Sequence, residues 1–267
     1  MSTRDAFSAD AANGLLTLAG YLPAGYPRAE EYDAAVGELS DAGFRILEIG
    51  IPPAPSGMDG RIIEEAVALV ARAGMEIRSA LALGGRAASR RGMAAIGMLY
   101  HATVEEVGLA ACMELFLEHG IHAILVPDMP GTEWKQYAQE AGSRGIEAVG
   151  FIPPDADEPA IRCIAAQAQG FLYVPSYAGR TGSSFDKSGS LSARLSRIRA
   201  ASAESGLPLA VGFGLRSARD VEAVRMMGAQ GAIVGTALVE AAGKGQATLR
   251  DLTRRIASAR GGMPCRR

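Results

Sequence analysis

The segment DAGFRILEIGIP, residues 41–52, carries the pattern that decides the fold. A helix-like stretch ends before Gly43, and the glycine turns the chain. The run Ile46–Ile51 that follows is apolar almost without interruption, which is typical of a strand buried on both faces of a parallel sheet. The same helix–glycine–strand order recurs in EHGIHAI (118–124), SRGIEAV (143–149) and MMGAQGAIV (226–234).

Extending this pattern in both directions predicts eight strands separated by helices. The predicted strands are Leu15–Tyr21, Ile46–Ile51, Ala94–Leu99, Ala123–Val126, Glu147–Ile152, Gly170–Val174, Pro208–Gly212 and Gly231–Val234. The predicted helices are Glu30–Asp41, Ile62–Arg72, Ile77–Arg90, Val104–Glu118, Thr132–Ala141, Glu158–Gln167, Leu191–Ser202, Ala218–Met227 and Ala237–Ala259. Eight even strand–helix units favour a (β/α)8 TIM barrel. A doubly wound open sheet is the alternative, but the first strand–turn unit has no GxGxxG.

The length of 267 residues is compatible with one large or two small domains. A (β/α)8 barrel takes about 250 residues, so we expect residues 1–267 to form one domain. Glycine is abundant: it makes up 33 of the 267 residues, or about 12%, whereas ~7% is usual. The glycines lie at the edges of apolar runs, which indicates tight turns or backbone that approaches a ligand closely.

Composition argues against several classes of function. A net charge of −2 and a pI near 6 do not indicate a nucleic-acid-binding surface. We also expect no membrane span, no secretory signal and a cytoplasmic location. Cys112, Cys163 and Cys265 lack the spacing of a zinc site or disulfide framework. His101, His119 and His122 cluster in sequence, but we expect solvated or capping histidines and no metal.

Two acidic residues lie in or after the second predicted strand. Glu48 lies inside the run ILEIGIP, where an acid must either pair with a cation or point into the mouth of the barrel. A partly apolar pocket raises the pKa of a carboxyl group and suits it to proton transfer near neutral pH. Asp59 follows in MDG; alone it indicates a turn, but beside Glu48 it could share acid, base and binding roles.

Three glycine-rich loops follow the last three predicted strands. They read YAGRTG (177–182), GFGLRS (212–217) and GT (235–236), and Ser217 is placed as a helix N-cap. Barrels often bind phosphate with such loops and a helix N-terminus. The loops therefore predict a phosphate site, although tight turns alone would give the same glycines.

The sequence resembles the tryptophan synthase alpha subunit family over nearly its whole length. The matching stretches are TLAGYLPAGYP (17–27), LEIGIP (47–52), MDG (58–60), GIHAILVPDMP (120–130), GFLYVPSYAGRTG (170–182), VGFGLRSARDV (211–221) and GAIVGTALVE (231–240). No single stretch is specific, but their combined order and spacing is.

The resemblance implies a barrel lyase that cleaves indole-3-glycerol phosphate to indole and glyceraldehyde 3-phosphate by a retro-aldol reaction. It implies no metal or organic cofactor. Glu48 matches the catalytic glutamate that moves protons, and Asp59 matches the aspartate that binds the indole N–H. The implied substrate-binding and phosphate-binding residues are Tyr100, Tyr173, Thr181, Gly182, Gly212, Phe213, Gly214, Gly235 and Thr236.

The sequence departs from the family mainly on loops that would face a beta subunit. The aromatic-Ser-Asp-Pro segment of the family is replaced by PAPSG (53–57), and its Asn-Pro after the third strand is replaced within YHAT (100–103). Arg61 and Arg180 stand where the family has a proline and an aliphatic residue. They could reshape the pocket for another substrate or simply face solvent.

Three hypotheses about function follow. The first, which we favour, is a lyase that releases indole alone or in a specialised pathway; a lyase for another aryl-glycerol phosphate is an alternative to it. The second is an ordinary tryptophan synthase alpha subunit acting with a beta subunit. The third is a non-catalytic partner that only binds a phosphorylated ligand, which the presence of both Glu48 and Asp59 disfavours.

Overall fold

A computed structural model describes residues 1–52, 58–176 and 190–261 of the chain. Its nine strands are all paired in parallel, in the order β5-β4-β3-β2-β1-β9-β8-β7-β6. Their bounds are β1 (Thr17–Pro23), β2 (Ile46–Gly50), β3 (Ala94–Met98), β4 (Ala123–Leu125), β5 (Glu147–Ala148), β6 (Gly150–Phe151), β7 (Leu172–Pro175), β8 (Leu209–Gly212) and β9 (Gly231–Val234).

The two ends of this strand order meet in the chain at Val149. Strand β5 pairs with β4, whereas β6 pairs with β7, and only Val149 separates β5 from β6. The Val149 N–H donates to the Ile124 carbonyl, 3.0 Å away, and the next N–H, of Gly150, donates to Phe171 at 3.2 Å. The predicted fifth strand is therefore one bent segment that closes the sheet, and the predicted (β/α)8 barrel is confirmed.

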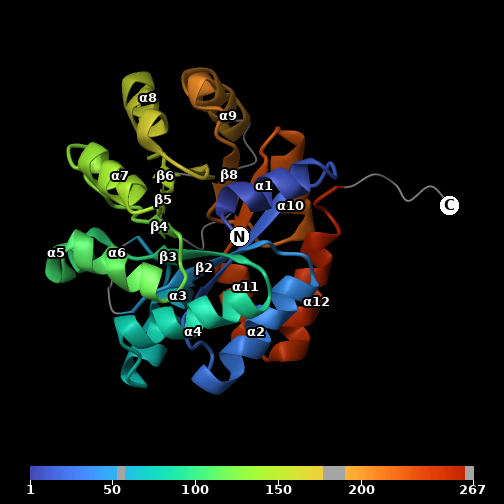
Figure 1. Ribbon diagram of the computed structural model, residues 1–267. Helices are drawn as coiled ribbons and strands as arrows, with labels where there is room; N and C mark the ends of the chain where they lie inside the picture. The colour runs from blue at the N-terminus through green and yellow to red at the C-terminus, as the bar shows by residue number, and fades with distance from the viewer. Residues whose placement is uncertain (53–57, 177–189, 262–267) are drawn as a thin grey trace.

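Helices surround the strands (Figure 1). Their bounds are α1 (Thr3–Ala11), α2 (Ala29–Asp41), α3 (Arg61–Arg72), α4 (Ile77–Arg90), α5 (His101–Val107), α6 (Leu109–Glu118), α7 (Trp134–Ser143), α8 (Glu158–Gln167), α9 (Ser190–Ala201), the short 3₁₀ helix η1 (Ala203–Ser205), α10 (Ala218–Met226), α11 (Thr236–Gly243) and α12 (Gln246–Ala257). No helix among the described residues is long and apolar enough to cross a membrane.

Two predicted helices are each divided in two. The prediction of one helix over Val104–Glu118 fails at Gly108, whose φ of +88° ends α5 and starts α6. The prediction over Ala237–Ala259 fails at Gly245, with a φ of +108°. Positive φ is strained for any residue with a Cβ, and the apolar periodicity on either side of these glycines hides the break.

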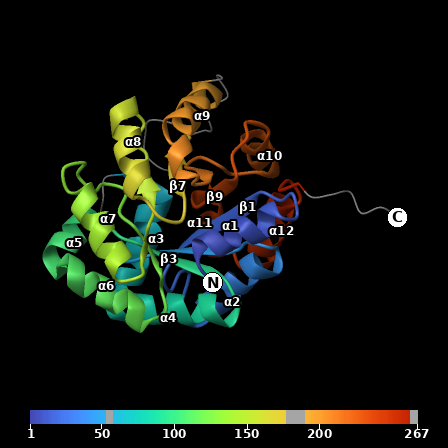
Figure 2. The same cartoon turned by 45° about the horizontal axis from the view of Figure 1, so that its top comes forward.

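Helix α1 is absent from the sequence-based prediction. It starts with a capping box in which Ser2 accepts from the Asp5 N–H and Asp5 accepts from the Ser2 N–H. The Ser-x-x-Asp spacing is the local signal that could have revealed it. The helix lies beside β1 (Figure 2).

Several glycines of the strands have a packing role. A Cβ on Gly97 of β3 would lie 2.3 Å from the Phe116 ring of α6, and one on Gly20 of β1 would lie 2.4 Å from Leu39 of α2. These strand residues face outward, so the missing side chain lets helices approach the barrel closely. Part of the glycine excess therefore serves helix packing and not ligand binding.

Candidate active site

Glu48 lies on β2 with its side chain toward the inside of the barrel. The residue is only 4% exposed, and it pairs in register with Tyr21 of β1 and Ile96 of β3. Burial raises the pKa of Glu48 to about 8, with the negative charge of Asp59 as a second cause. The carboxyl group is therefore mostly protonated at neutral pH and can donate a proton as well as accept one.

Asp59 directly precedes Gly60, the N-cap residue of α3, and is 5% exposed. The Tyr100 hydroxyl donates to Asp59 Oδ2 across 2.6 Å, in a buried hydrogen bond. Tyr100 comes directly before α5, so this bond joins the segments that follow β2 and β3. A carboxylate held by a buried donor keeps a fixed direction, which suits Asp59 to bind a ligand N–H.

Tyr21 is a site residue that the sequence analysis did not single out. It lies on β1 and borders the same cavity as Glu48 and Asp59. The pKa of its hydroxyl is raised well above the usual value, first by burial and then by the charges of Asp59, Tyr100 and Glu48. A tyrosine two residues before the strand-ending Pro23 was the available signal, but only the parallel register places it level with Glu48.

The rings of Tyr173 and Phe213 form an aromatic wall of the cavity, and the Phe151 ring packs against both. The Tyr173 ring of β7 lies 5.5 Å from Phe151 and 5.7 Å from Phe213, between ring centroids. Tyr173 lies across the backbone of Gly212, where a Cβ would come within 2.2 Å of its hydroxyl oxygen. Gly212 therefore supports the ring of Tyr173 and does not itself border the cavity. A flat apolar ligand would fit against this wall.

The backbone after β8 has an unusual conformation. Phe213 has a φ of +62°, the only positive value among described residues other than glycine, and Gly214 follows at +79°. Left-handed backbone at a bulky residue costs of order 1–3 kcal/mol and is found mostly at functional sites. The Ser176 hydroxyl donates to the Phe213 carbonyl oxygen and holds the turn in place.

The N-terminus of α11 opens onto the same cavity. Gly235 is its N-cap residue and Thr236 its first residue, and both border the cavity. Free N–H groups and the helix dipole make such a terminus a favourable position for an anion. Ser217, as predicted, caps α10 in a capping box with Asp220. Thr181 and Gly182, which the sequence also predicts here, lie outside the described residues, as does Arg180.

The cavity enclosed by these groups is small, about 30 Å³, which is room for one water molecule, so an indole ring would enter only if the lining side chains moved apart. Its described lining is Tyr21, Glu48, Asp59, Ile63, Met98, Tyr173, Phe213, Gly214, Ile233, Gly235 and Thr236. Tyr100 is not part of this lining and contacts Asp59 from behind. Around this cavity the structure brings together, of the predicted residues, Glu48, Asp59, Tyr173, Phe213, Gly214, Gly235 and Thr236.

Arg194 on α9 is a supporting residue that sequence reasoning missed. Its guanidinium donates to the carbonyls of Pro175 at 2.7 Å and of Ile152 at 3.0 Å. Those carbonyls stand at the ends of β7 and β6, so Arg194 fixes two strand ends next to Tyr173. One arginine in an ordinary amphipathic helix gives no local signal of this role.

The remaining sequence candidates lie away from the cavity. Arg61 has an 83% exposed side chain paired with Glu65 at 3.3 Å, so it faces solvent. His101 follows β3, whereas His119 and His122 precede β4 at the other end of the barrel. Within the described residues there is no cluster of potential ligands for a metal ion, and Cys112 and Cys163 are free thiols.

Known proteins match this chain closely. The family model described as tryptophan synthase alpha chain matches residues 7–263. The tryptophan synthase alpha chain of Mycobacterium marinum is 31% identical over 252 residues, which cover 94% of this chain and 92% of that protein. The Mycobacterium leprae protein of the same name is 31% identical over 253 residues, with the same coverage.

Solved structures point to the same family. A structure of Mycobacterium tuberculosis tryptophan synthase superimposes with a TM-score of 0.88 at 30% identity, covering 97% of this chain and 98% of that one. Its aminoacrylate-bound form gives a TM-score of 0.85 at 28% identity, covering 98% of this chain and 100% of that one. The chain therefore belongs to the tryptophan synthase alpha chain family.

Proposed function

We propose that this chain is a carbon–carbon lyase that cleaves indole-3-glycerol phosphate to indole and glyceraldehyde 3-phosphate. The observation that carries the proposal is the buried Glu48, with a pKa raised to about 8, beside an Asp59 fixed by Tyr100. The aromatic wall offers a surface for an indole ring. The N-terminus of α11 offers a position for a phosphate.

In the proposed reaction, protonated Glu48 donates its proton to C3 of the indole ring. The positive charge that develops reaches the ring nitrogen, and the Asp59 carboxylate stabilises it by accepting from the indole N–H. The bond between C3 and the glycerol carbon then breaks, and its electron pair restores the aromatic ring. The hydroxyl group on that glycerol carbon gives its proton to Glu48 as the carbon becomes the aldehyde, so the acid is regenerated.

A pKa near 8 suits this sequence of proton transfers. A carboxyl group with an ordinary pKa would be ionised at pH 7 and could not act first as an acid. The same low-polarity surroundings that raise the pKa of Glu48 also strengthen the attraction between Asp59 and a cationic ring. The substrate assigned here needs one acid–base group and one fixed anion, and the cavity supplies both.

We further propose that the chain acts on this substrate without a beta subunit. Support comes from the sequence: the family segment that contacts that subunit is replaced by PAPSG at residues 53–57, which lie outside the described residues. A conventional alpha subunit would need its partner for full activity. We place the protein in the cytoplasm as one barrel domain, in keeping with its free Cys112 and Cys163.

The test is to incubate the purified chain with indole-3-glycerol phosphate and measure indole by chromatography. We expect release of indole by the chain alone, and a loss of about 10²-fold or more in Glu48→Gln. Addition of the Mycobacterium tuberculosis beta chain should change the rate less than twofold.

Other outcomes identify the competing hypotheses. Strong activation by the beta chain would refute the stand-alone part and indicate an ordinary alpha subunit. Turnover of another aryl-glycerol phosphate in preference would refute the substrate assignment. Binding of substrate without any indole, with or without the beta chain, would refute the lyase proposal and indicate a binding partner only. Glu222→Gln on the exposed face of α10 controls for the substitution itself.

A further inference from the structure

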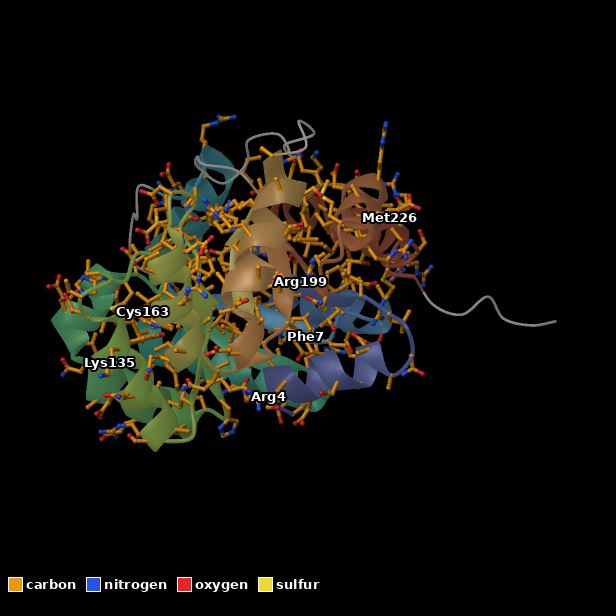
Figure 3. The ribbon with its side chains drawn as sticks, turned by 90° about the horizontal axis from the view of Figure 1, so that it is seen from above. Arg4, Phe7, Lys135, Cys163, Arg199 and Met226 are labelled. Carbon is orange, nitrogen blue, oxygen red and sulfur yellow. The ribbon has the colours of Figure 1, made fainter. Side chains whose placement is uncertain are left out.

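A second and larger cavity lies at the amino end of the barrel. This groove has a volume of about 640 Å³, and α1 forms one wall with Arg4 and Phe7 (Figure 3). Its floor includes Leu16, Pro208 and Gln230, which directly precede β1, β8 and β9. Residues before parallel strands lie at the end opposite to the residues that follow them. The groove is therefore separate from the candidate active site.

Several apolar side chains line the groove. Phe7, Leu16 and Ala229 border it and are each less than 9% exposed, and Leu207 adds a partly buried side chain. The Phe7 ring itself packs at 5.3 Å, between centroids, against Phe171 in the core. A rigid aromatic ring backed by the core gives a small apolar molecule a fixed surface to contact.

The charged side chains that border the groove are all positive. Arg4 and Arg225 both border it, and none of the described residues in its lining is an aspartate or glutamate. Arg225 Nε is buried and has no hydrogen-bond partner within the described parts of the chain. A buried donor without an acceptor is unfavourable, and an arginine guanidinium matches the geometry of a carboxylate. A carboxylate bound in the groove would give this Nε–H an acceptor.

We propose that this groove binds a small carboxylate with an aromatic body, with Arg225 and Arg4 receiving the carboxylate and Phe7 contacting the ring. The volume lies within the roughly 300–1,000 Å³ of small-molecule sites. A charged hydrogen bond to a guanidinium in a partly buried setting is strong enough to select an acid over its neutral analogue. This site is additional to the proposed lyase site and does not depend on it.

The experiment is a calorimetric titration of the whole chain with 4-phenylbutyrate and with its neutral amide. Saturating glycerol 3-phosphate is present throughout, so that an anion occupies the active-site end. We expect one site per chain, with the carboxylate at least about tenfold tighter than the amide and weaker as salt is raised. Equal affinity of acid and amide, or no saturable binding of either, would overturn the proposal.

Three variants locate the site. Arg225→Met keeps the apolar stem and removes the charge, so we expect the Kd of the carboxylate to rise at least about tenfold. Arg219→Met, on the exposed face of the same helix α10 and outside the groove, should leave the Kd unchanged. Arg4→Met on α1 gives an independent third measurement. Identical behaviour of all three variants and the unaltered chain would place the ligand elsewhere and refute the assignment.

Discussion

The substitution Glu48→Gln should stabilise the folded chain, and by an amount that grows with pH. Glu48 has a pKa of about 8 when folded and 4.5 in the reference state. The folded chain thus binds a proton that the unfolded chain has already lost between these values, and its stability falls as pH rises through this window. Glutamine has no such proton to lose, so the variant escapes this decrease.

The size of the effect follows from the two values. One pH unit between them corresponds to about 1.4 kcal/mol, so ionising Glu48 inside the folded chain costs about 5 kcal/mol in full. Most of that cost develops between pH 5 and pH 8. We expect the difference in unfolding free energy, Glu48→Gln minus the unaltered chain, to increase by about 3 kcal/mol between pH 5 and pH 8. This is a large share of the 5–15 kcal/mol typical of a folded domain.

Urea unfolding at pH 5, 6, 7 and 8 measures the difference. Circular dichroism follows the helices, and the fluorescence of Trp134, the one tryptophan and 5% exposed, reports on the core. Subtracting the unfolding free energy of the unaltered chain from that of the variant cancels the contributions of the other titrating groups. Glu222→Gln, exposed on α10, should show no such trend. A Glu48→Gln difference that stays constant across pH would refute the raised pKa and with it the proton-donor role.

Three further outcomes are expected. The value of kcat/KM for indole-3-glycerol phosphate should fall above about pH 8, as the pKa of Glu48 requires; a flat profile to pH 9 would exclude it as the acid. Tyr100→Phe removes the donor to Asp59 and should lower kcat/KM about tenfold, whereas Tyr137→Phe, which loses a 3.3 Å bond to a core carbonyl, should not. Ser217→Ala removes the α10 cap and should lower the unfolding free energy by about 1 kcal/mol in urea titrations, and an unchanged midpoint would count against that cap.

Local sequence determined the barrel and the acid at its centre. Runs such as Ile46–Ile51 must be buried on both faces, and a closed barrel does this with helices outside and packed side chains inside; eight such units favour closure. An acid inside an apolar run has few possible environments, which is why Glu48 could be predicted. Ser217 could be predicted as a cap because capping depends only on the next few residues.

Tertiary structure decided what depends on contacts between distant segments. The bond between Tyr100 and Asp59 joins residues 41 positions apart, and the pairing of Tyr21 with Glu48 follows from strand register. The left-handed backbone of Phe213 contradicts its own local preference and persists because the surrounding contacts hold it. The groove around Arg225 likewise arises where α1 meets three strand beginnings. Periodicity describes one segment at a time, so it fixes the elements, whereas the distances between their side chains are set only when the barrel closes.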